Sequence, residues 1–214
     1  GLVVSLARTI EADVAALPCS QIIVDGESMG DTLVAFDLLE LDGKDLRGLG
    51  YAERHRRMVS VITKANVASI TYAMLYTTTE VKRAAYAAAK ANNEEGVVFR
   101  LLESTYVPGC PNSGGTALKD KFVESATVVV TNLNDKRSVA IHVFDATGMV
   151  VPVGNVTIPP STPLPAQDDI VEVEYLYGFP TLYQPVYKGK RYDQSASDCT
   201  LDKIKLKKEL ALAA

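Results

Sequence analysis

Three short stretches combine residue types that could bind a nucleotide and a metal ion. Residues 25–27 (DGE) place two carboxylates at positions i and i+2 of an expected strand, so both lie on one strand face. In residues 94–100 (EEGVVFR) a carboxylate enters an apolar strand beside a glycine that permits close backbone approach. Residues 119–121 (KDK) place two amines on one face of another strand. Because lysines neutralise phosphate oxygens and carboxylates hold Mg²⁺ or a ribose hydroxyl, these stretches suit a nucleotide and metal site.

Each stretch also has a plain structural explanation. Strand ends often carry charged side chains, so Glu27 and Glu95 could be exposed strand-end charges and the paired lysines an ordinary solvated face. Phe36 lies in an apolar strand, where core packing explains it equally well. Short motifs also recur by chance. Taken singly, these residues leave both interpretations open.

The elements that must position these residues can be predicted from turn residues and periodicity. Residues 21–27 and 32–39 form the two strands of a predicted hairpin that turns at Met29-Gly30-Asp31. Residues 51–65 are expected to be helical, with a polar and basic first half. These predictions place the DGE motif and Phe36 on neighbouring strands.

A second helix and two further strands follow. The alanine-rich residues 79–92 are the clearest helix, with Thr79 as its N-cap and an Asn-Asn pair to end it. A strand begins at once after the helix, in residues 95–104. A loop rich in Gly, Pro, Ser and Asn then leads to a short strand at residues 118–122. No GK[ST] follows this loop, so a P-loop is not expected.

The composition changes near residue 120, beyond which strands and turns dominate. The turns are expected at NDKR, DATG and the proline-rich PPSTPLPAQ. Short strands at this spacing predict a small barrel, in particular an OB-fold. The expected strands are residues 124–133, 138–145, 149–158, 169–178 and 181–189.

The order of these motifs carries more information than any one of them. DGE, FDLLELDGKDLR, EGVVFR, a K-x-K strand and a strand-rich region resemble, in that order, the nucleotidyltransferase superfamily of ATP-dependent DNA ligases. The strings VPVGNVTIPP, DIVEVEYLYG and LYQPVYKGKRYD are similar to the OB-fold of ligases from that group, particularly small phage and bacterial forms. The resemblance implies an α+β chain: a partial nucleotidyltransferase (ATP-grasp-like ligase adenylation) domain at residues 1–120, then an all-β OB-fold at 121–214.

The resemblance also implies roles for single residues in binding ATP and Mg²⁺. Glu27 would contact the ribose or help place the metal, and Phe36 would stack on adenine. Glu95 would help bind the catalytic metal, while Lys119 and Lys121 would contact the AMP phosphate. If so, Glu27, Glu95 and the two lysines converge on one nucleotide-sized pocket beside a separate small barrel.

Nicked double-stranded DNA is the partner that the resemblance implies. The OB-fold would hold the DNA backbone through Lys188, Lys190 and Arg191, and Arg8 is similar to an arginine that the family places near the nick phosphate. In the tail LDKIKLKK, three lysines alternate with apolar residues and would share one face of a strand. An edge strand protected by lysines against aggregation explains this tail equally well.

The chain departs from the family at the first chemical step. There, a lysine in K-x-D-G attacks the α-phosphate of ATP to form a phosphoramidate. The two Asp-Gly pairs of this chain have Ile23 and Glu40 in the lysine position, so neither can supply the nucleophile. The chain also begins at Gly1 rather than Met. We therefore expect part of a longer ligase; a ligase-like protein that has lost adenylation is the alternative.

Composition and charge constrain the class of protein. The 214 residues carry a net charge of −4, which is not typical of a strongly basic nucleic-acid binder, although a local basic groove can lie on an acidic protein. The three cysteines and two histidines are isolated, so no zinc site is expected. We expect no membrane association, a monomer, and a location in the cytoplasm, or in the host cytoplasm if the chain is phage-encoded.

The expected function is therefore sealing of DNA nicks through AMP transfer, in DNA repair, replication and recombination. A non-catalytic ligase-like module that binds nucleic acid or a protein partner is the second hypothesis. A related RNA ligase or capping-type transferase is the third. The choice of DNA depends on the OB-fold strings, because the other motifs are shared across the superfamily.

Overall fold

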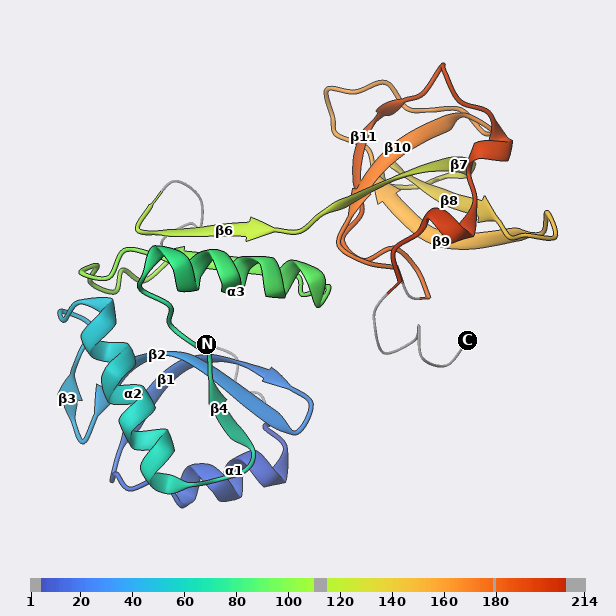
Figure 1. The fold of residues 1–214 in the computed structure, drawn as a ribbon. Helices are drawn as coiled ribbons and strands as arrows, with labels where there is room; N and C mark the ends of the chain where they lie inside the picture. The colour runs from blue at the N-terminus through green and yellow to red at the C-terminus, as the bar shows by residue number, and fades with distance from the viewer. Residues whose placement is uncertain (1–4, 110–114, 179, 207–214) are drawn as a thin grey trace. The chain divides into compact units, whose positions relative to one another are not determined.

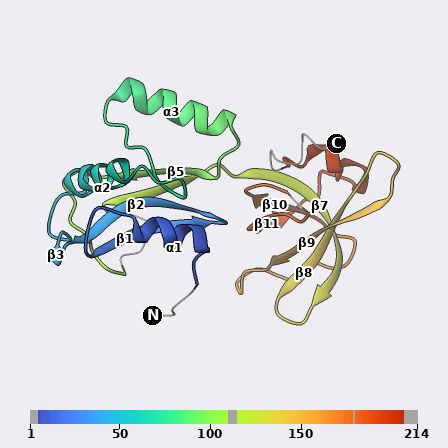
Figure 2. The same ribbon diagram turned by 90° about the horizontal axis from the view of Figure 1, so that it is seen from below.

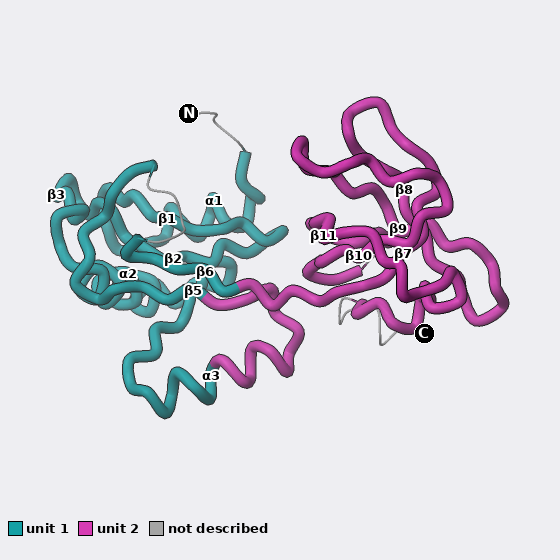
Figure 3. Tube along the Cα trace, turned by 90° about the horizontal axis from the view of Figure 1, so that it is seen from above, with its two compact units in different colours: residues 1–85, 98–120 teal, residues 86–97, 121–214 magenta. Residues whose placement is uncertain are grey.

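The computed structural model describes residues 5–109, 115–178 and 180–206. The chain divides into two compact units (Figure 3): residues 1–85 with 98–120 form unit 1, and residues 86–97 with 121–214 form unit 2. The boundary between the units runs through a helix and through a pair of strands, so each unit is built from two separate stretches of chain. Each unit is described by itself below.

A twisted sheet forms the base of unit 1 (Figure 1). β1 (Ile22–Met29) and β2 (Thr32–Leu41) form the predicted antiparallel hairpin, which turns at Gly30 with φ +62°. β3 (Lys44–Asp45) pairs antiparallel with the end of β2, and β4 (Ile70–Tyr72) pairs parallel with its start. The predicted hairpin is confirmed, whereas β4 carries too short an apolar pattern to have been expected.

The β1–β2 ladder is interrupted twice, and both extra residues lie in β2. Val24 pairs with Leu38 where regular pairing would use Leu39, and Gly26 pairs with Ala35, which leaves Phe36 without a partner in β1. Such bulges bend the strand and redirect side chains. As a result, Ala35 and Leu38 lie on one face, whereas Asp37 lies on the other.

Two helices pack against the apolar face of this sheet (Figure 2). α1 (Arg8–Ala15) buries Ile10, and Asp13 accepts hydrogen bonds from the backbone N–H and the hydroxyl of Ser69, both at 2.7 Å. α2 (Tyr51–Ala65) is the predicted helix, and it ends at Asn66 in a left-handed conformation, φ +50°. The core of unit 1 combines Leu17, Ala35, Leu38, Leu46, Met58, Val61, Ile62 and Ile70.

The third helix and the next two strands follow the predicted order. α3 (Thr79–Ala91) ends two residues before Asn93, which takes up φ +56° as a stop residue. The side chain of Thr78, not of Thr79, accepts the hydrogen bond from the Val81 N–H, so the predicted N-cap is wrong by one residue. β5 (Gly96–Arg100) pairs with β6 (Ala117–Lys121).

The main part of unit 2 is a closed five-stranded barrel in the order β10-β11-β9-β8-β7. Every neighbour pair is antiparallel except β11–β9, which is parallel. The inward positions are apolar, and Val128, Val130, Val139, Val143, Val171 and Val173 are fully buried. The strands are β7 (Glu124–Asn134), β8 (Ser138–Phe144), β9 (Val150–Thr157), β10 (Ile170–Tyr175) and β11 (Val186–Lys190).

The barrel confirms the predicted OB-type architecture but not the predicted tail strand. Residues Leu201–Lys203 form a 3₁₀ helix (η2), after a similar turn at Ala196–Asp198 (η1), so the alternating lysines do not share a strand face. Lys205 instead binds Glu124 at 2.9 Å, and Lys207 lies outside the described residues. No helix in the described part of the chain is long and apolar enough to cross a membrane.

Candidate functional site

The sheet of unit 1 has a polar face opposite its apolar core. Paired residues of neighbouring strands lie on the same face, and Asp25 pairs directly with Asp37. Glu27, two residues further along β1, shares this face with Asp25. Like charges directly opposite each other are destabilising, so the two aspartates need cations nearby.

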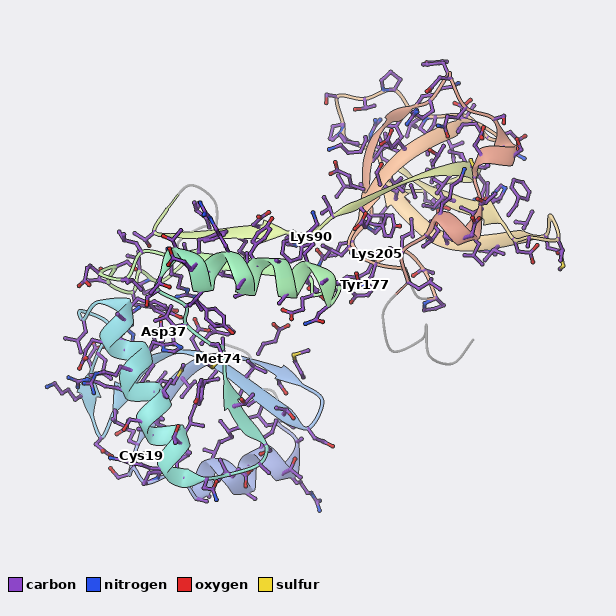
Figure 4. All side chains as sticks on the ribbon, in the orientation of Figure 1. Cys19, Asp37, Met74, Lys90, Tyr177 and Lys205 are labelled. Atoms are coloured by element: carbon purple, nitrogen blue, oxygen red, sulfur yellow. The ribbon has the colours of Figure 1, made fainter. Side chains whose placement is uncertain are left out.

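Two arginines supply those cations. Asp37 is fully buried and forms a two-pronged ion pair with Arg54 of α2: Nε to Oδ1 is 2.8 Å and Nη2 to Oδ2 is 2.9 Å. Arg100, the last residue of β5, adds an Nη1 to Oδ2 contact at 3.3 Å. Asp37, labelled in Figure 4, thereby links the sheet to both α2 and β5.

A second function of Arg54 is to hold the chain that leaves β5. Its Nη1 donates to the carbonyl oxygens of Leu49 and of Ser104, the latter at 3.0 Å. The backbone N–H of Ala52 donates to the carbonyl of Leu102 at 2.9 Å, and the N–H of Tyr106 donates to that of Arg47. Residues 102–106 are thus fixed across the start of α2.

A polar cavity of about 150 Å³ opens between these groups. It is lined by Asp25, Arg54 and Arg100, by residues 104–107, and by Gly109, Thr116 and Ala117. Burial raises the pKa of Asp25, while Arg100 lowers it, Asp37 raises it and Lys119 lowers it. The role of Lys119 in a nucleotide site stays a prediction, because the cavity is not lined by Lys119.

Phe36 lies beside this network rather than in the core. It is half-buried and is not a member of the hydrophobic core cluster of unit 1, although Ala35 and Leu38 are. Its carbonyl accepts a hydrogen bond from the Tyr51 hydroxyl at 3.0 Å. Phe36 therefore lies outside the core cluster of unit 1, and its stacking on adenine stays a prediction.

Glu95 and Lys121 belong to unit 2, and both contact the barrel. A Glu95 carboxylate oxygen accepts a hydrogen bond from the Tyr177 hydroxyl at 3.3 Å, and the Tyr177 ring stacks on Tyr183. Lys121 donates to the side-chain oxygen of Gln184 at 2.7 Å. Tyr177 is labelled in Figure 4.

The four side chains that the sequence predicts to converge on one pocket belong to two different units. Glu27 and Lys119 belong to unit 1, whereas Glu95 and Lys121 bind barrel residues of unit 2. None of the four lines the polar cavity described above. All four side chains are exposed, and Glu27 and Lys119 lie in different sheets of unit 1.

Each cation that the sequence assigned to DNA on the barrel has an acidic partner. Lys188 binds Glu174 at 3.0 Å and Lys190 binds Asp169 at 2.5 Å. Arg191 binds Glu172 and Asp193, and the second contact is 2.7 Å. This face of β10 and β11 is therefore close to neutral rather than basic. Arg8, at the start of α1, is exposed.

The metal-binding capacity of the described residues is limited. Among them, no group of three or more His, Cys, Asp or Glu side chains could hold a metal ion. Mg²⁺ usually uses only one or two carboxylates and completes its octahedron with water and substrate phosphates. Glu27 in unit 1 and Glu95 in unit 2 each offer a single carboxylate, so the proposed Mg²⁺ would need further ligands from water and a bound nucleotide.

Sequence reasoning missed Tyr51, Arg54, Arg100 and Asp37. Tyr51 and Arg54 lie in the first half of α2, which the sequence predicts to be polar and basic. In the structure both side chains are buried. An arginine on the apolar side of α2, in register with Met58 and Ile62, was a possible signal of a buried ion pair. Its acidic partner, Asp37, has no comparable signal in the sequence, because the bulge at Phe36 decides on which face of the sheet Asp37 lies.

Comparisons with known proteins agree with the motifs. Residues 20–121 match the family model of the ATP dependent DNA ligase domain. A DNA ligase of Halorubrum lacusprofundi is 39% identical over 105 residues, which is 49% of this chain. The chain spans 17% of the length of that relative. The predicted resemblance to ATP-dependent DNA ligases is thereby confirmed.

Solved structures support the fold of the nucleotidyltransferase and OB-fold domains. A Lig E DNA ligase structure matches with a TM-score of 0.58 at 14% identity. The match covers 75% of this chain and 63% of the Lig E chain. The structure named Pmar-Lig_PreS3 matches with a TM-score of 0.57 at 16% identity. The match covers 84% of this chain and 48% of that structure's chain. At this identity the similarity concerns the fold alone. The predicted α+β fold class is confirmed.

Proposed function

We propose that the chain contributes the later part of the adenylation domain and the OB-fold of an ATP-dependent DNA ligase. The proposed boundary is the predicted one, with residues 1–120 in the adenylation domain and 121–214 in the OB-fold. In this proposal the whole protein seals nicked double-stranded DNA by AMP transfer, with ATP and Mg²⁺. The single observation that carries the proposal is the match of residues 20–121 to the ligase family model.

The proposed nucleotide site lies on the polar face of unit 1. Glu27 would contact the ribose or the metal, Phe36 would stack on adenine, and Lys119 would neutralise phosphate. Glu95 and Lys121, which belong to unit 2, would have the metal and phosphate roles that the family resemblance implies. The family match over residues 20–121 supports this arrangement, because both Glu27 and Lys119 lie within it.

The proposal extends to the biological setting. We infer roles in DNA repair, replication and recombination, a phage-like origin, a monomeric state and a cytoplasmic location. These inferences depend on the resemblance of the C-terminal strings to small ligases.

A direct test measures ATP binding to the chain by titration calorimetry with Mg²⁺ present. We expect Glu27→Gln and Lys119→Gln each to weaken binding by about tenfold, since each removes a charged contact worth roughly 1.5 kcal/mol. Lys44→Gln, which removes an exposed lysine of β3 in the same unit, is the matched control. Equal affinity of all three variants and the unaltered chain would refute the assignment of the site.

A non-catalytic ligase-like module is the second candidate, and two observations favour it. Neither Asp-Gly pair is preceded by the lysine that the family uses. The barrel cations assigned to DNA are also already engaged with carboxylates. Such a module would bind duplex DNA or a protein partner without binding ATP. An RNA ligase or capping-type transferase would instead bind the nucleotide and prefer an RNA end over a DNA nick.

A further inference from the structure

Phe36 occupies an unusual position in the backbone of unit 1. It is the extra residue of the second bulge, placed between Ala35, which pairs with Gly26, and Asp37, which pairs with Asp25. Bulges occur next to active sites, where they re-aim a side chain. A residue outside the ladder needs another contact to fix its peptide group.

Tyr51 supplies that contact. Its hydroxyl donates to the Phe36 carbonyl at 3.0 Å, and the ring is buried, with 6% of its surface exposed. The Arg100 guanidinium lies over the ring, with Cζ 4.8 Å from the centroid, and Arg100 is itself bound to Asp37. Tyr51 therefore contacts the Phe36 carbonyl through its hydroxyl and, through its ring, the arginine that binds the next residue of β2, Asp37.

We propose that Tyr51 is a positioning residue for the base of a bound adenine nucleotide, and that it acts through Phe36. This inference rests on the proposed function, in which the Phe36 ring stacks on the base. Tyr51 is buried, so it does not touch the ligand itself. By fixing the Phe36 carbonyl, it restricts rotation of the peptide group at the bulge and so holds the ring in one direction.

The proposal separates positioning from general support of the fold. If Tyr51 acts only through Phe36, its hydroxyl matters for binding only while the aromatic ring is present. If it merely stabilises unit 1, its removal affects binding equally with or without that ring. A double-mutant cycle distinguishes the two.

The experiment measures ATP affinity of the full chain by calorimetry for Tyr51→Phe, Phe36→Leu and the double variant. Loss of one hydrogen bond to a neutral acceptor predicts that Tyr51→Phe weakens binding about fivefold. In the Phe36→Leu background the same change is expected to have no further effect. Tyr76→Phe, at a half-exposed tyrosine of unit 1, is the matched control and should bind like the unaltered chain.

A second readout protects the test against a folding defect. The carbonyl carbon resonance of Phe36 reports its hydrogen bond in the free protein, and should shift in Tyr51→Phe while the thermal midpoint changes little. An equal loss of affinity in both backgrounds overturns the inference, as does unchanged affinity of Tyr51→Phe. If the unaltered chain binds no ATP, the proposed function fails and this inference fails with it.

Discussion

Asp37 and Arg54 form a buried ion pair that joins the bulged strand of unit 1 to its longest helix. Both prongs are short, 2.8 and 2.9 Å, and the two side chains are 0% and 1% exposed. Asp37 also forms an ion pair with Arg100, and Arg54 also donates a hydrogen bond to the Ser104 carbonyl. Asp37 therefore connects β2 to α2 and to the last residue of β5.

Removal of that carboxylate should destabilise unit 1 strongly. Asp37→Ala leaves the Arg54 charge buried without a partner, which costs about 3–5 kcal/mol. Urea unfolding followed by circular dichroism measures the loss. Asp45→Ala, which breaks an exposed pair with Arg47, is the control and should cost less than about 1 kcal/mol. Similar costs for the two variants would contradict the structural role of Asp37.

The glycine of the DGE motif is required by close backbone packing. A Cβ at Gly26 would lie 2.7 Å from the Val34 carbonyl oxygen and 3.2 Å from the Ala35 Cα. Because backbone atoms cannot move aside cheaply, Gly26→Ala should cost about 1–3 kcal/mol of stability. At Gly48 a Cβ meets nothing within 4 Å, so Gly48→Ala should be close to neutral. Equal melting temperatures of the two variants would show that the β1–β2 register is different.

The buried thiol of Cys199 should be unreactive in the folded chain. Burial raises its pKa to about 11 from the usual 9.0, and the neighbouring Asp198 charge acts in the same direction. At about pH 8 almost no thiolate is present, so alkylation of native Cys199 should be far slower than in urea. Mass spectrometry of the alkylated peptides measures the rates. Fast labelling of Cys199 in the native chain would indicate that the barrel core is open.

The same shift predicts an alkaline loss of stability in unit 2. The folded thiol stays neutral until the pH approaches 11, whereas the unfolded thiol ionises near pH 9. Its contribution is therefore complete below about pH 9 and is lost as the pH rises toward 11. In Cys199→Ala this component of the pH dependence should be missing, although the variant is less stable at every pH.

The barrel cations can be tested for DNA contact. Exposed ion pairs are weak, so Lys188 and Lys190 can exchange Glu174 and Asp169 for phosphates. If they bind the backbone, Lys188→Gln and Lys190→Gln should each reduce the slope of log affinity against log salt by about 1. Lys136→Gln, in the turn between β7 and β8, should leave it unchanged. Identical slopes for all three variants and the unaltered chain would exclude this face as the DNA contact.

Much of the fold followed from local sequence signals. Glycine at the turn between β1 and β2, the alanine-rich α3 and the asparagine that ends it, and the alternating valines of the barrel all specify their elements locally. α1 and β4 were missed because α1 is stabilised by a distant contact, from Asp13 to Ser69. The tail was predicted as a strand because its alternation of lysine with apolar residues outweighed a weak 3₁₀ signal.

The candidate site was less predictable, because its geometry depends on non-local register. Asp37 lies on the polar face because Phe36 is an extra residue in the β1–β2 ladder. No residue type in β2 predicts that bulge. Arg54 looks solvent-facing in sequence but is among the most buried residues. Motif order predicts roles for Glu27 and Lys119, whereas the ion pairs of Asp37 with Arg54 and Arg100 have no local sequence signal.

The adenylation chemistry gives the most direct test of the central claim. The chain should be incubated with ATP and Mg²⁺, and its intact mass measured for the addition of AMP, beside the full product of its reading frame. We predict an AMP adduct on the longer product only, at a lysine upstream of residue 25. An adduct on this chain itself, or on neither product, would contradict the account.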